Sequence, residues 1–142
     1  MSAILAVDVG SVRLGVAACE AVGLPALPLT TIAHQSREKD VQAVAALARE
    51  RGAHTIVIGY PLRLTGDRGP AAEKMDKFIE ALRAAFDGEV VAVDERLTSA
   101  AADAKLRGAG MDGAARRELV DRFAAVEILE SYLARLRRSD RA

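Results

Sequence analysis

Three acidic positions stand where a carboxylate serves no evident structural purpose. The first, Asp8, interrupts the most apolar run of the chain, residues 3–9, which has the pattern of a strand buried on both faces. A buried carboxylate without a partner is costly, so Asp8 needs a metal ion, a basic group or several backbone amides beside it. Gly10 then allows a tight turn and the close approach of a ligand. An Asp that caps its own β-turn would explain the same pattern.

The second acidic position is the pair Asp94 and Glu95, followed by Arg96, at the end of the apolar run over residues 89–94. Ligands bind beyond the carboxyl ends of strands in open sheets. Adjacent strand residues face opposite ways, so only one of the two acids can point at a given site unless the strand has already ended. An exposed turn with an ion pair between Glu95 and Arg96 is the alternative interpretation.

The third acidic position is Asp121, inside a long helical pattern from about residue 114 to 137. The residues three, four and seven positions further on are two alanines and an isoleucine, so Asp121 lies on a half-buried stripe rather than on the polar face. Small alanines would also let the helix approach a sheet closely. A salt bridge of Asp121 with Arg117 or Arg122 is the alternative.

Carboxylates from a strand interior, a strand end and a helix can converge at one edge of a sheet. Such a cluster stays ionised only with cations, and oxygen ligands without His or Cys nearby select Mg²⁺ or Mn²⁺ over Zn²⁺. Two such ions about 3.5–4 Å apart activate a water and stabilise the leaving oxygen in phosphodiester hydrolysis. His34, His54 and the single cysteine, Cys19, are expected to be a loop residue, a strand-start residue and a core residue.

Apolar runs and helical periods predict the elements that would position these acids. Strands are expected at 3–9, 13–19, 27–32, 54–59 and 89–94, and helices at 37–51, 70–86, 98–107 and 114–137. The first three strands suggest an antiparallel meander, and strands reached through helices should run parallel to the first. The order β-β-β-α-β-α-β-α-α predicts an α/β fold of the ribonuclease H-like arrangement, a mixed five-stranded sheet with helices on both faces.

Length and composition narrow the functional classes. The 142 residues suit a single domain spanning 1–142. The 20 Lys+Arg and 20 Asp+Glu residues cancel, which excludes a globally basic nucleic-acid-binding protein but not a local basic face. Aromatic residues are too scarce, at 4%, for a row of stacked bases. With one cysteine, no membrane-length apolar run and no signal peptide, a cytoplasmic location is expected.

Four segments carry a resemblance to a known family. Residues 8–17 are similar to an opening D-x-G-x-x-x-x-G-V-A, 59–66 to a G-x-P-x-x-x-x-G loop, 94–99 to D-E-R-L-[ST]-[ST], and 121–129 to D-x-x-A-A-x-x-I-L. With these motifs the chain resembles, over nearly its whole length, the YqgF (RuvX) family of Holliday-junction-resolvase-like nucleases, also called pre-16S rRNA nucleases. Each motif alone is weak, but four in order at family spacing are specific.

The resemblance implies a ribonuclease H-like fold and a metal-dependent nuclease in which Asp8, Glu95 and Asp121 are the catalytic acids and hold Mg²⁺ or Mn²⁺, with Asp94 as an alternate ligand. It also implies a nucleic-acid substrate, either the precursor of small-subunit 16S rRNA in ribosome biogenesis or branched DNA in recombination and repair. A symmetric junction resolvase needs two sites, so a homodimer is expected in that case. Many members have a basic residue in place of Val12, which bears on substrate contacts rather than on catalysis.

Arginines near the acids in sequence are the candidate phosphate contacts, although any one of them could be ordinary solvated surface. They are Arg13, Arg63, Arg68, Arg96, Arg116 and Arg117. Two other functions compete with hydrolysis of nucleic acid. A phosphoryl-transfer ATPase would share the Asp-x-Gly opening, but 142 residues leave no room for the second domain that closes over a nucleotide. A non-catalytic RNA-binding factor in ribosome assembly would keep the fold without the chemistry.

Overall fold

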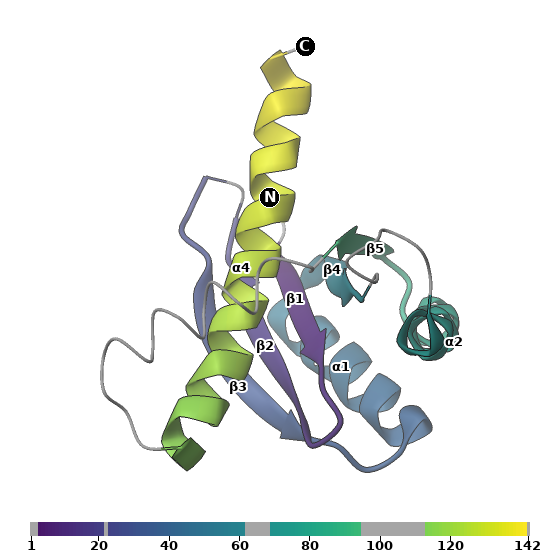
Figure 1. Ribbon diagram of the computed structural model, residues 1–142. Helices are drawn as coiled ribbons and strands as arrows, with labels where there is room; N and C mark the ends of the chain where they lie inside the picture. Colours follow the sequence, from purple (N-terminus) through teal and green to yellow (C-terminus); the bar gives the residue numbers. More distant parts are fainter. Residues whose placement is uncertain (1–2, 22, 62–68, 95–112, 142) are drawn as a thin grey trace.

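The computed structural model describes residues 3–21, 23–61, 69–94 and 113–141, with the backbone alone over 113–122 and 139–141. Along these residues the order is β1 (Ala3–Val9), β2 (Arg13–Cys19), β3 (Leu27–Ala33), α1 (Arg37–Arg51), β4 (Ala53–Tyr60), α2 (Pro70–Ala85), β5 (Glu89–Asp94) and α4 (Gly113–Arg141) (Figure 1). The expected strands and long helices are present, most within one residue of their predicted ends, and α4 runs four residues further. The short helix expected at 98–107 lies outside the described residues.

The strands form one five-stranded sheet in the order β3-β2-β1-β4-β5. β1 pairs with β2 and β2 with β3 in antiparallel fashion, whereas β1 pairs with β4 and β4 with β5 in parallel. This confirms the predicted mixed sheet. The parallel strands β1, β4 and β5 therefore end at the same border of the sheet, which we call the carboxyl edge.

Side chains of β1 alternate between two cores, one on each face of the sheet. Leu5 and Val7 belong to the core with α1 and α2, whereas Ile4 and Ala6 belong to the core with α4. All four are at most 1% exposed, so β1 is buried on both faces, as its apolar run predicts. Figure 1 shows α1 and α2 on one side of the sheet and α4 on the other. We call these the α1–α2 face and the α4 face.

The first two helices begin and end where their sequences predict. Ser36 caps α1, accepting a hydrogen bond from the Lys39 N–H at 3.2 Å. Gly52 ends α1 in the left-handed conformation, with φ 67°, and its N–H bonds to the Arg49 carbonyl. Pro70 is the first residue of α2, where its fixed φ and missing N–H fit a helix start.

Helix α4 is 29 residues long, about 43 Å at the usual rise, and contacts all five strands. Its contact with the sheet is lined by small side chains. Ala6 of β1 and Ala17 of β2 share one core with Ala125 of α4, and all three are fully buried. The close approach predicted from these alanines is therefore in place. In the part of the chain described, no helix is long and apolar enough to cross a membrane.

Gly10 closes the turn between β1 and β2 and so fixes the end of β1. Its N–H donates to the Arg13 carbonyl at 3.1 Å, and a Cβ at this position would lie 2.5 Å from the same oxygen. We expect Gly10→Ala to lower the free energy of unfolding by about 1–3 kcal/mol, because the turn must open to remove the clash. Urea denaturation measures this change. The exposed neighbour Ser11→Ala is the control, and equal stability of the two variants would show that the turn rearranges freely.

Candidate functional site

Asp8 lies at the carboxyl edge, one residue before the end of β1, and is half-buried. Strand residues two apart share a face, so Asp8 is on the α4 face with Ala6. The acid that interrupts this otherwise apolar strand therefore lies on the side of the sheet that α4 covers.

Glycines lie beside Asp8 on both neighbouring strands. Gly15 of β2 is directly opposite Asp8. In β4, Gly59 follows Ile58, the residue that pairs with Val7 of β1. Since neither glycine has a side chain, neither residue places a β-carbon beside Asp8 on the α4 face.

Asp94 lies at the carboxyl edge but on the other face. In β5, Val93 contacts the core on the α4 face and Val90 the core on the α1–α2 face. By the same alternation Asp94 is on the α1–α2 face, opposite to the face of Asp8. Glu95, the next residue in the chain, lies outside the described residues.

Position 121 lies in the part of α4 near the carboxyl edge, because α4 begins at that end of β1 (Figure 1). Ala125 and Ile128, four and seven residues further on, are fully buried, as the predicted stripe requires. Ala6 and Ala125 belong to one core. From Ala6 to Asp8 the strand advances about 6.6 Å, and from Ala125 back to position 121 the helix returns about 6 Å. The backbone therefore brings positions 8 and 121 to the same end of the α4 face.

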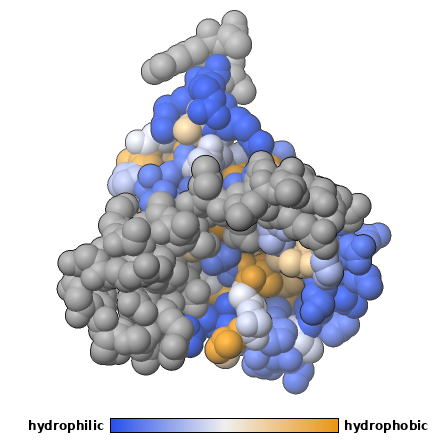
Figure 2. Space-filling view, in the orientation of Figure 1, coloured by the Kyte–Doolittle hydropathy of each residue, from blue (hydrophilic) through white to orange (hydrophobic). Residues whose placement is uncertain are grey.

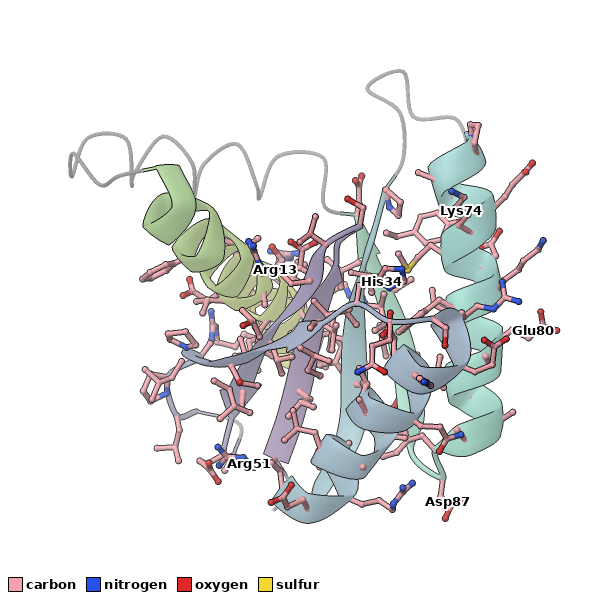
Figure 3. All side chains as sticks on the ribbon, turned by 90° about the horizontal axis from the view of Figure 1, so that it is seen from below. Arg13, His34, Arg51, Lys74, Glu80 and Asp87 are labelled. Atoms are coloured by element: carbon pink, nitrogen blue, oxygen red, sulfur yellow. The ribbon has the colours of Figure 1, made fainter. Side chains whose placement is uncertain are left out.

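Among the candidate arginines, Arg13 has a described side chain and is on the same face as Asp8. It begins β2, two residues from the Gly15 that pairs with Asp8. Figure 3 shows Arg13 between the sheet and α4. Such diagonal positions are about 7–8 Å apart, within reach of an arginine.

The remaining five candidates are less closely placed. Arg116 and Arg117 lie in the first turns of α4, where only the backbone is described. Arg63, Arg68 and Arg96 lie outside the described residues.

Over the described residues, no three His, Cys, Asp or Glu side chains gather closely enough to hold a metal ion. Two of the three expected ligands, Glu95 and the Asp121 side chain, lie outside the described part of the chain. Asp8 itself offers a half-buried carboxylate, the type of oxygen ligand that a hard divalent cation prefers. Cys19 and His54 have the structural roles expected from the sequence: Cys19 is fully buried, and His54 lies at the start of β4, where its ring bonds to the Ala3 carbonyl.

Solved structures with the same fold define the class of protein. RuvC of Thermus thermophilus in complex with a Holliday junction matches with a TM-score of 0.59 and 18% identity over 96% of both chains. The Fowlpox virus resolvase, also in complex with Holliday junction DNA, matches with a TM-score of 0.58 and 12% identity over 94% of this chain and 98% of that one. The fold is that of the ribonuclease H-like resolvases.

Sequence comparison gives the family. The family described as "RuvX: Holliday junction resolvase" matches residues 2–135. Relatives named "Putative pre-16S rRNA nuclease" include one from Syntrophus aciditrophicus, 45% identical over 92% of this chain and 87% of the relative, and one from Clostridium perfringens, 39% identical over 94% and 97%. The chain belongs to the RuvX (YqgF) family of Holliday-junction-resolvase-like nucleases, which confirms the resemblance.

Proposed function

We propose that this nuclease uses two metal ions on the α4 face of the carboxyl edge, and that it matures the 5′ end of precursor 16S rRNA in the cytoplasm. The observation that carries the proposed site is Asp8 itself, a half-buried acid between two glycines at the end of the sheet where α4 begins. The names of the curated relatives favour precursor rRNA as the substrate.

In this proposal Asp8, Glu95 and Asp121 hold Mg²⁺ or Mn²⁺. Asp94 is the less suitable ligand, because it occupies the face opposite to Asp8. When bound by these residues, the metal ions would supply an activated water and would stabilise the leaving oxygen. Arg13 binds a phosphate of the strand beside Asp8 and holds it against the sheet. The glycines at positions 15 and 59 leave space for the sugar-phosphate backbone.

Branched DNA is the second candidate substrate, favoured by the likeness of the fold to resolvases bound to Holliday junctions. Symmetric cleavage of a junction requires two active sites, so this alternative predicts a homodimer. A third candidate is a non-catalytic RNA-binding assembly factor, which would bind precursor rRNA without cleaving it.

A single comparison of substrates separates these functions. Precursor 16S rRNA, a four-way DNA junction and duplex DNA are incubated side by side with the purified protein and Mn²⁺. Cleavage of the precursor at one end of the mature sequence, with the junction intact, is the expected result. Symmetric cutting of the junction by a dimer would favour the resolvase instead, and binding without cleavage would favour the assembly factor. Light scattering gives the oligomeric state in the same preparation.

Phosphate contacts make a prediction about salt. Arg13→Ala should weaken nucleic-acid binding for all sequences alike and flatten the dependence of log affinity on log salt by about 0.7 for a single strand and 0.9 for a duplex. Arg51→Ala is the control, because Arg51 lies at the opposite end of the sheet and pairs with Glu20 (Figure 3). An unchanged slope in Arg13→Ala, or a loss confined to one nucleotide sequence, would contradict this role.

A further inference from the structure

A cavity of about 590 Å³ opens at the carboxyl edge on the α1–α2 face, the side of the sheet away from the Asp8 site. Its walls come from the β1–β2 turn, the segment that leads into α1, the start of α1, the residue after β4 and the first turns of α2. In Figure 2 hydrophobic surface is visible in this hollow, between the hydrophilic surfaces of α1 and α2.

Cations dominate the rim of the cavity. Arg37 at the start of α1 and Lys74 and Lys77 on α2 are all exposed and all line it. Among the lining residues Asp40 is the one carboxylate. A region with three cations and one acid attracts anions, although the chain as a whole is neutral.

The one acid that lines the cavity, Asp40, is hydrogen-bonded to other groups of the protein. Asp40 is 2% exposed, and its two oxygens bond to His34 Nδ1 at 2.5 Å and to the Gln35 N–H at 3.0 Å. Because an ionised carboxylate only accepts hydrogen bonds, Nδ1 carries the proton in this pair, and Nε2 takes no part in it. The Asp40 carboxylate therefore orients a half-exposed histidine, and the three exposed cations still outnumber this one acid. In Figure 3 His34 and Lys74 border the same space from the sheet side and from α2.

The floor of the cavity is apolar, with Val9, Pro61 and Met75 among its residues. A bare phosphate needs neither this floor nor this volume, and a purely apolar ligand does not need three cations. A nucleotide has both parts, since its base offers flat apolar faces and its phosphate is an anion. The combination of a cationic rim and an apolar floor therefore fits a nucleoside monophosphate unit.

We propose that this cavity binds one nucleotide, with its phosphate at Arg37, Lys74 and Lys77 and its base against Pro61 and Met75. The nucleotide can be an unpaired residue of a bound strand or a free nucleoside monophosphate, which have the same chemistry. In the first case the inference rests on the proposed function. The cavity and Asp8 lie on opposite faces of one edge. A strand that crosses the carboxyl edge thus reaches both, and the cavity holds the unpaired segment while the Asp8 site acts further along.

The first test measures binding of a fluorescently labelled single-stranded RNA by anisotropy, with chelator present so that cleavage does not contribute. Lys74→Ala/Lys77→Ala is expected to bind roughly 10- to 30-fold more weakly at 0.1 M salt, with a salt slope lower by about 1.4, as for two lost phosphate contacts on a single strand. Lys39→Ala/Arg138→Ala removes the same charge from exposed positions outside the cavity and is the control. Equal affinity of the two double variants would overturn the proposal.

The second test identifies the ligand by competition against the labelled strand with adenosine monophosphate, adenosine or inorganic phosphate. The monophosphate should displace the strand at a lower concentration than either of its parts, and this preference should disappear in Lys74→Ala/Lys77→Ala. Equal potency of phosphate and the monophosphate would overturn a nucleotide site. Tighter binding of the strand than of the monophosphate assigns the unpaired residue as the source, and the reverse assigns the free nucleotide.

Neither test depends on hydrolysis. If the nuclease function fails, the protein lacks cleavage but still shows the difference between the double variants. If the cavity proposal fails, the two variants bind alike while metal-dependent cleavage by the wild type continues. The two failures are therefore distinguishable.

Discussion

Asp8→Asn is expected to abolish cleavage while the protein stays folded. The amide keeps the shape of the carboxylate but removes a charge that the metal ions require. Since a bound metal ion contributes several kcal/mol to the stabilisation of the transition state, the loss should be roughly a thousandfold or more in rate. Without metal, the thermal midpoint should stay the same or rise, because repulsion among crowded carboxylates is relieved.

The neighbouring acids supply a matched comparison for this first variant. Glu95→Gln should lose activity as Asp8→Asn does, whereas Asp94→Asn should keep most of it, because Asp94 is on the opposite face of the sheet. Cleavage rates measured on one substrate, with circular dichroism to check the fold, decide the matter. Near-normal turnover by Asp8→Asn would contradict the whole site. A larger loss of activity in Asp94→Asn than in Glu95→Gln would make Asp94 the metal ligand in place of Glu95.

Removal of divalent metal should be as damaging as loss of Asp8. Activity should disappear in excess chelator, return with Mg²⁺ or Mn²⁺, and fail to return with Ca²⁺. Calcium takes more ligands at longer distances, about 2.3–2.6 Å against 2.0–2.1 Å for magnesium, and so misplaces the attacking water.

Calorimetry distinguishes binding from catalysis in the metal experiment. Mn²⁺ should bind the wild type and bind more weakly to Asp8→Asn, and Ca²⁺ should compete with Mn²⁺ without supporting cleavage. Full activity in excess chelator would exclude a metal-dependent mechanism.

The sequence predicts elements well where one periodicity dominates. The apolar run of β1 and the helical period of α1, with Ser36 and Gly52 at its ends, leave little ambiguity, and the structure confirms both. The boundary that differs by more than one residue is the end of α4. Its last residues are polar and therefore carry no apolar stripe to read.

The choice between Asp94 and Glu95 could not be made from the sequence. Adjacent strand residues face opposite ways, so the answer depends on which core each valine of β5 contacts, and that is a property of the assembled sheet. The structure assigns Val93 and Val90 to different cores and thereby places Asp94 on the α1–α2 face.

The cavity on the α1–α2 face has no sequence signal of its own. Lys74 and Lys77 fit the solvated side of an amphipathic helix, and His34 fits an ordinary loop residue. They gather only because α2 packs beside α1 while the β1–β2 turn reaches the same edge. The one local signal is Asp40, an acid at a buried position of α1 whose partner lies six residues earlier.

The alanines between α4 and the sheet set the distance between the two elements that carry the candidate site. Ala6 and Ala17 on the sheet and Ala125 on the helix set how closely the two backbones approach, while none of them carries a reactive group. A larger residue at Ala125 would push α4 outward and lengthen the span between positions 8 and 121. The proposed pair of metal ions, about 3.5–4 Å apart, would tolerate little such change. Selection for activity should therefore constrain these alanines as strictly as the acids. A mutational scan that scores only folding would not detect their effect on the spacing of the site.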